Sequence, residues 1–82
     1  MAGKGYLLRD AKELAPLAAW EKGHRFNRRR WSRLPLGAGD MAQHWVIACS
    51  RCEMGLELVP GRVEGRVRWW AAGPALTKQC EA

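Results

Sequence analysis

The stretch Cys49-Ser-Arg-Cys52 follows the strand-like run His44-Trp-Val-Ile-Ala and precedes Glu-Met-Gly55. Two cysteines separated by two residues at the end of a strand are typical of a metal-binding turn, because both sulfur atoms can converge on one ion. Gly55 suits the tight exit that such a turn requires. We therefore expect this turn to hold a structural zinc ion on which the folded form of the chain depends.

Size and composition also favour a metal-stabilised domain. The chain has 82 residues, of which 48% are hydrophobic, with five tryptophans and three cysteines. A chain this short buries only about 60% of its unfolded surface, so small scaffolds usually add a disulfide set or a metal. No apolar run approaches the roughly 20 residues of a membrane span, and the N-terminal residues lack the apolar centre of a signal peptide. We expect a cytoplasmic location, where cysteines serve as metal ligands.

The remaining zinc ligands must come from elsewhere in the chain. Structural zinc sites use four thiolates and imidazoles, and Cys80 is the remaining cysteine beside two histidines. Alternation along a strand would point His44 away from the face that carries Cys49. His24 follows Gly23 after an expected helix, where the backbone can turn the ring inward. We favour His24 over His44, which gives a Cys3His site of His24, Cys49, Cys52 and Cys80.

Residues 10–23 are expected to form a helix after a loose start over residues 1–9. Asp10 and Glu13 resemble a capping box, and Gly23 is a natural C-terminal stop. Pro16 leaves the helix start open: inside the helix it would remove the bond to the Lys12 carbonyl, whereas in a first turn it is tolerated. At helical spacing one face carries three apolar residues, Leu14, Leu17 and Ala18.

Residues 24–40 are expected to form a basic loop, and residues 41–82 a zinc-ribbon-like part with short antiparallel strands. Strand patterns cover residues 44–48, 56–59 and 66–71. Pro60-Gly61 should stop the second strand, and Glu64-Gly65 is another candidate turn, so the hairpin register stays open. The fold class is thus α+β: one zinc-stabilised domain over residues 10–82, with the helix packed on an antiparallel hairpin of two or three strands.

The layout from Gly23-His24 through Cys49-x-x-Cys52 and Met54-Gly55 to Gly73-Pro74-Ala75-Leu76 and Cys80 resembles a group of small zinc-ribbon-like proteins. They occur in actinobacteria and especially in their bacteriophages, and the similarity covers roughly residues 23 to 80. It implies the ligand set His24, Cys49, Cys52 and Cys80, and a phage or actinobacterial origin. Glu53 departs from the pattern, because ribbons commonly have a glycine or another small residue directly after the second cysteine.

The net charge of +6 is concentrated in one segment. Between Lys22 and Arg33 lie six basic residues and no acidic one, and the charges outside this segment balance. Arginine binds phosphate through paired hydrogen bonds, and exposed aromatic rings stack on unpaired bases. Alternation in the third expected strand puts Arg66, Arg68 and Trp70 on one face. The expected binding surface comprises Arg25, Arg28, Arg29, Arg30, Trp31, Arg33, Arg66, Arg68 and Trp70.

Catalysis is not expected. A single C-x2-C motif also occurs in redox proteins, but there it normally opens a helix, and no helical pattern follows Cys52. A Cys3His zinc ion has no open position for a water molecule, and the sequence contains no phosphate-binding glycine loop. The cysteine pair would have no metal role at all if Cys49 were merely a buried apolar residue.

These features predict a non-enzymatic zinc-binding protein that binds nucleic acid, or a nucleic-acid-processing complex, through a basic surface rich in arginine and tryptophan. The alternative is a protein-interaction module whose arginines meet an acidic surface, for example a phage factor in the host cytoplasm that inhibits or redirects a host protein. A third interpretation is a solvated basic face without a partner, since arginine side chains often cover apolar surface with their heads in water.

Overall fold

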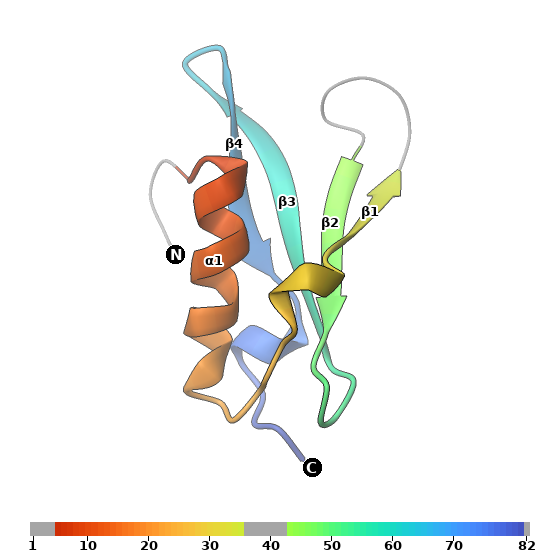
Figure 1. Ribbon diagram of the computed structural model, residues 1–82. Coiled ribbons are helices and arrows are strands. Elements are labelled where there is room, and N and C mark those ends of the chain that lie inside the picture. The colour runs from red at the N-terminus through yellow and green to blue at the C-terminus, as the bar shows by residue number, and fades with distance from the viewer. Residues whose placement is uncertain (1–4, 36–42, 82) are drawn as a thin grey trace.

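The computed structural model describes residues 5–35 and 43–81 of the chain. Across these residues the chain forms helix α1 (Leu8–Trp20), the short 3-10 helix η1 (Arg28–Arg30), strands β1 (Ser32–Pro35), β2 (Gln43–Ala48), β3 (Gly55–Val63) and β4 (Arg66–Ala72), and the 3-10 helix η2 (Pro74–Leu76). The strands make one antiparallel sheet in the order β1-β2-β3-β4 (Figure 1). The expected α+β class is confirmed, with a four-stranded sheet in place of the expected hairpin of two or three strands.

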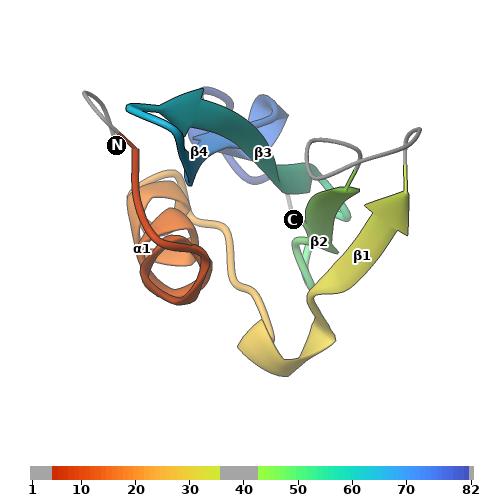
Figure 2. The ribbon, with the colours of Figure 1, turned by 90° about the horizontal axis from the view of Figure 1, so that it is seen from above.

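The core lies between α1 and one face of the sheet. Figure 2 shows α1 under β3 and β4, with β2 and β1 on the other side of the molecule. On the sheet side the buried residues are large, and on the helix side they are small: Leu56, Leu58, Ile47 and Trp69 face Ala11, Ala15 and Ala19. The alanines let the helix approach the bulky sheet side chains closely, which explains why the helix buries this face.

The expectation for the apolar face of the helix is therefore wrong. Leu14 and Leu17 are exposed, as is Ala18, because the sheet leaves room only for alanines. The helix also begins at Leu8, so Asp10 lies in the first turn and not at the N-cap, which is Leu7 and has no side-chain cap. A carboxylate in the first turn still interacts favourably with the helix dipole.

Pro16 lies inside α1 and is buried there. Because proline has no N–H, the carbonyl of Lys12 loses its helical partner. The indole Nε1 of Trp31 donates a hydrogen bond to that same oxygen, at 3.1 Å. The segment after η1 thus completes the backbone hydrogen bonding of the helix, which explains how a central proline is tolerated.

Strand β3 continues through Pro60 and Gly61, where the sequence suggested a stop. On the β4 side, Pro60 lies opposite Trp69, but the backbone N–H and C=O of Trp69 form hydrogen bonds with Tyr6 and not with Pro60. On the other side, the pairing of β3 with β2 has already ended at Leu58. The missing N–H of Pro60 therefore breaks no ladder bond. A Cβ atom at Gly61 would lie 2.6 Å from the Trp70 ring, so the strand needs glycine at this position.

The hairpin between β3 and β4 turns at Glu64-Gly65. Both residues have left-handed backbone conformations, with φ values of 52° and 78°. Val63 pairs with Arg66 directly across this two-residue loop. Two left-handed residues in a two-residue loop match the right-handed twist of the strands. The structure thus selects the second of the two candidate turns.

Strand β1 was not expected, because residues 24–40 looked like a basic loop. Its four residues are all exposed, so neither face has the alternating pattern that marks a half-buried strand. The remainder of that expected loop, residues 36–40, and residues 41 and 42 lie outside the described residues. The expected loose N-terminus is described only from Gly5, and Tyr6 there is bonded to Trp69 in both directions, at 3.0 and 2.8 Å. No helix among the described residues is long and apolar enough to cross a membrane.

A double-mutant cycle tests the role of Trp31 in capping the proline gap. Trp31→Phe removes the indole donor, and we expect it to lower the free energy of unfolding by about 1 kcal/mol more in the natural chain than in a Pro16→Ala background. In that background the N–H of residue 16 can bond to the Lys12 carbonyl. Urea unfolding of the four metal-loaded proteins measures the difference, and equal costs in the two backgrounds would contradict this role.

Candidate metal centre

Four potential ligands meet at one end of the molecule. His24 follows α1, Cys49 and Cys52 belong to the turn between β2 and β3, and Cys80 follows η2. Their ligand atoms all lie within 4.8 Å of one another. Figure 1 shows the end of α1, the β2–β3 turn and the C-terminal segment converging at this end. The three cysteines are free thiols, so the group can hold a metal ion.

The separations within the group fit a tetrahedral ion. Cys49 Sγ and Cys80 Sγ are 3.9 Å apart, and Cys52 Sγ lies 3.4 Å from His24 Nδ1. A tetrahedron built with metal–sulfur bonds of about 2.3 Å and metal–nitrogen bonds of about 2.0 Å has S–S edges of about 3.8 Å and S–N edges of about 3.5 Å. The two distances are therefore close to those of ligands around a single ion.

The ring of His24 is oriented by its second nitrogen. The side chain is fully buried, at 0% exposure, and Nε2 lies 2.7 Å from the backbone oxygen of Lys78. A carbonyl oxygen only accepts, so Nε2 must carry the proton and donate it. Nδ1 then has a lone pair directed at the cysteines. This arrangement, in which one ring nitrogen is held by a carbonyl and the other faces the metal, is common for histidine ligands.

Backbone contacts bring the ends of the chain to the cysteine turn. Gly23 has a φ of 87°, and a Cβ atom there would approach Cys80 Cβ to 3.3 Å, so the backbone at this position favours glycine. The N–H of Cys80 donates to the carbonyl of Lys22 at 2.7 Å. The C-terminal segment is therefore paired with the residue that precedes Gly23, which sets Cys80 beside His24.

The cysteine turn is closed by its own hydrogen bonds. The N–H of Glu53 donates to the carbonyl of Cys49, and the N–H of Cys49 donates to that of Met54, both at 2.9 Å. Glu53 has a left-handed φ of 64°, so the conformation that favours glycine falls here. Gly55 has no such φ and open space around it. The tight exit was expected at Gly55, but it lies at Glu53, the residue that departs from the zinc-ribbon pattern.

The environment of Cys49 favours its thiolate. Burial alone would raise the pKa of this thiol, but backbone N–H groups of Arg25, Cys52 and Arg51 and the ring of His24 lower it to about 6. The N–H groups of Arg25 and Arg51 each lie 3.4 Å from Sγ. Metal binding needs a deprotonated thiol, so these N–H groups prepare Cys49 as a ligand.

The same contacts affect the imidazole of His24. Burial would lower its pKa, but the Lys78 carbonyl and the sulfurs of Cys49 and Cys52 raise it overall. A metal ion would replace the proton that these groups attract to Nδ1. The cluster therefore offers the Cys49 thiolate and one basic nitrogen to a cation.

His44 lies outside the cluster, on the opposite face of β2 from Cys49. Its Nδ1 is 3.8 Å from a carboxylate oxygen of Glu57 on the neighbouring strand and has no hydrogen-bond partner among the described residues. Ile47 and Cys49 are buried on the other face of the strand. The alternation that argued against His44 as a ligand is therefore present in the structure.

The arginine-rich segment lies beside the cluster, but only part of it is available to a partner. Arg28, Arg29, Arg30 and Arg33 are exposed. Arg25 stacks on the ring of Trp20 at 3.3 Å and donates to the backbone oxygen of His24 at 2.8 Å. Trp31 packs against the core and caps the Lys12 carbonyl. The sequence could not reveal these internal roles, because they depend on contacts with α1.

The second part of the expected surface lies at the far edge of the sheet. Arg66, Arg68 and Trp70 are on β4 and alternate with core residues as expected, whereas β1 forms the other edge. The ring of Trp70 is half-buried and packs on Gly61 and Gly5, where added Cβ atoms would lie 2.6 and 2.9 Å from it. Arg33 on β1 and the basic residues of β4 therefore lie at opposite edges of the sheet.

Comparisons of the chain with protein-family models, curated proteins and solved structures found no match. The resemblance to small zinc-ribbon-like proteins of actinobacteria and their phages therefore stays a prediction. What the residues themselves define is a small α+β fold with a candidate His/Cys3 metal site.

Paired histidine variants test the ligand set. We expect the natural chain and His44→Gln to bind one metal ion per chain. His24→Gln should lower the metal affinity by more than about 100-fold. Even the loss of a residue that only hydrogen-bonds to a metal ligand lowers metal affinity about 10- to 100-fold. Native mass spectrometry gives the stoichiometry, and competition with a chromophoric chelator gives the affinity. Loss of the metal in the His44 variant with retention in the His24 variant would contradict the assignment.

Proposed function

We propose that this protein is a non-enzymatic binding module built around a structural zinc ion. Three thiolates and one imidazole are a donor set that suits zinc. His24, Cys49, Cys52 and Cys80 together supply four ligand atoms, which is the full number for a structural site. With all positions filled by protein, no position is left for a substrate or a reactive water molecule, which is why we assign the ion a structural role.

We propose further that the module binds nucleic acid through the exposed arginines of η1 and β1. The observation that carries this proposal is the position of Arg28, Arg29 and Arg30 on a short helix held close to the candidate metal site. One exposed guanidinium group can donate two parallel hydrogen bonds to the oxygens of a phosphate. Clustered positive charge also attracts polyanions over long distances. Because Trp31 is engaged with α1, phosphate contacts should dominate over stacking on this ring.

A protein partner is the second candidate, and the outer face of α1 favours it. Leu14, Leu17 and Trp20 are 38%, 57% and 55% exposed on that face. Exposed tryptophan and leucine side chains often anchor protein interfaces. In this reading the module docks on another protein with α1, as expected for a phage factor acting on a host protein in the cytoplasm.

Charge reversal at two places tests the nucleic-acid proposal. Arg28→Glu/Arg29→Glu and Arg66→Glu/Arg68→Glu change the net charge equally, but only the first pair alters η1. We expect the first to weaken binding to oligonucleotides at least about 10-fold, and to reduce the slope of log K against log salt by about 0.7 to 0.9 per lost phosphate contact. The second should bind within a few-fold of the natural chain. Fluorescence anisotropy over a salt series measures both.

Two outcomes would reject the nucleic-acid proposal. One is the absence of binding to single- and double-stranded oligonucleotides even at low ionic strength. The other is an equal loss in the two variants, which would indicate attraction by net charge alone. A pull-down from cell extract, with and without nuclease treatment, then tests the protein partner: a protein band retained after nuclease, and lost in Leu17→Glu, would support docking through α1.

A further inference from the structure

A cleft opens where η1 arches away from β2. Pairing between β1 and β2 ends at Ser32 and Val46. The next backbone contact between the segment that contains η1 and the end of β2 is the hydrogen bond from the N–H of Ser50 to the carbonyl of Arg25, at 2.8 Å. Between these two contacts the backbone of η1 stands off from the end of β2. The cleft beneath has a volume of about 1070 Å³, comparable with the upper end of small-ligand sites at roughly 1000 Å³.

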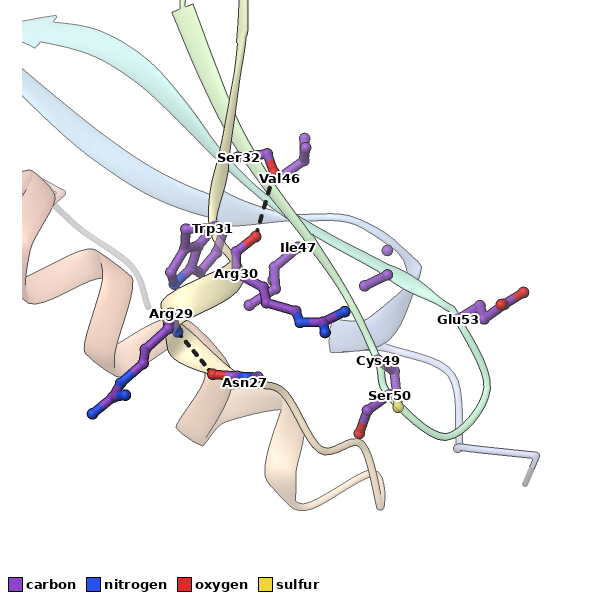
Figure 3. Close-up of a pocket in the computed structure, with 12 residues that line it drawn as sticks. Asn27, Arg29, Arg30, Trp31, Ser32, Val46, Ile47, Cys49, Ser50 and Glu53 are labelled. Atoms are coloured by element: carbon purple, nitrogen blue, oxygen red, sulfur yellow. Dashed lines mark hydrogen bonds between the residues drawn. The ribbon is translucent and has the colours of Figure 1, made fainter.

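The lining combines an apolar floor with polar and basic groups. Trp31 and Ile47, on the core side of β2, contribute the apolar part, and Asn27, Ser32 and Ser50 contribute polar side chains. Figure 3 shows the Arg30 side chain extending across the cleft toward Ser50 and Cys49, whereas Arg29 points outward. Glu53 is the one acidic residue among those that line the cleft. Arg30 therefore offers a contact for one phosphate beside the apolar part of the cleft.

The shape of the cleft excludes an extended peptide. A peptide that adds to a sheet needs several residues of open strand edge. Here β1 covers β2 up to Val46, which leaves only Ile47 and Ala48 beside the cleft, and both ends are closed by backbone contacts. Such a site suits one flat group that enters from the side and carries its negative charge at the rim.

The serine hydroxyls can contribute to recognition. Ser50 Oγ donates to the Arg25 carbonyl at 3.1 Å and Ser32 Oγ to the Arg30 carbonyl at 3.4 Å. Each hydroxyl therefore directs its hydrogen at a backbone carbonyl of residues 25–31, the η1 arch, and can still accept a hydrogen bond from a ligand. The Asn27 side-chain oxygen accepts from the N–H of Arg29 at 3.1 Å, which directs its amide group. Acceptors beside an apolar floor fit the amino groups on a base edge.

We infer that this cleft binds one unpaired nucleotide of a single-stranded nucleic acid, with the base beside Trp31 and Ile47 and an adjoining phosphate on Arg30. This inference rests on the proposed nucleic-acid function and adds a preference to it. In a duplex each base is paired and stacked, so it cannot enter the cleft without being unstacked. The protein should therefore bind single strands more tightly than duplexes of the same sequence.

The test compares three probes: a single strand, the same strand with abasic sites, which has the same number of phosphates, and a duplex hairpin made from one strand with that same number. The intact strand and the hairpin are prepared as both DNA and RNA, and the abasic strand as DNA. We expect the natural chain to bind the intact single strand at least about 5-fold more tightly than the duplex or the abasic strand. Anisotropy at fixed salt gives the affinities. The abasic strand keeps the phosphates and removes the bases, so it isolates the contribution of the cleft.

A neighbouring arginine supplies the matched control. Arg30→Ala and Arg28→Ala each remove one exposed arginine from η1, but Arg28 lies on the other side, beside Arg9, Lys12 and Glu13. Arg30→Ala should reduce the preference for single strands over duplexes to about 2-fold or less, whereas Arg28→Ala should weaken both probes alike. Both residues are exposed, so circular dichroism should show the natural fold in each variant.

The outcomes separate this inference from the function on which it rests. Equal binding of the intact strand, duplex and abasic strand would overturn the nucleotide site and leave phosphate binding by η1 intact. The same holds if Arg30→Ala and Arg28→Ala behave alike. If no probe binds at low salt, the proposed function fails and the inference fails with it.

Discussion

His24, Cys49, Cys52 and Cys80 come from three separate parts of the chain and meet at one end of the molecule. Their convergence joins the end of α1, the turn between β2 and β3, and the C-terminal segment. The apolar core contributes modestly on the helix side, because the buried residues of α1 are mainly alanines, which bury little area per residue. Zinc-binding free energies of about 10–16 kcal/mol in small domains become folding free energy, which is large beside a core of this size.

The metal site and the proposed binding surface are mechanically linked. The Arg25 N–H contacts Cys49 Sγ, and its carbonyl accepts from Ser50, so the start of the η1 arch is attached to the cysteine turn. The far side of the arch is held by Trp31 on α1. A bound ion that fixes the turn would therefore also fix the cleft and the arginines above it. In this account the metal orders the binding surface without touching the ligand.

The sequence was sufficient to name the four residues that the structure brings together, because few cysteines and histidines were available and strand alternation disfavoured His44. It was insufficient where tertiary contacts override local patterns. The leucines expected on the buried face of α1 are exposed, and alanines face the bulky sheet residues in their place. Strand β1 has no buried face that could produce an alternating hydrophobic pattern. Pro60-Gly61 lies within a strand because Trp70 packs on the glycine. Trp31 was expected to stack on bases, but its indole N–H donates to the Lys12 carbonyl, which Pro16 leaves without a helical partner.

The most direct test of the central claim is a chelator titration of the purified protein, followed by circular dichroism and by native mass spectrometry on the same samples. We expect the loss of one zinc ion per chain and the loss of helical and aromatic signals to occur together, and added zinc to restore both. A chain that contains no metal, or that keeps its spectrum and its thermal midpoint after the metal is removed, would contradict it.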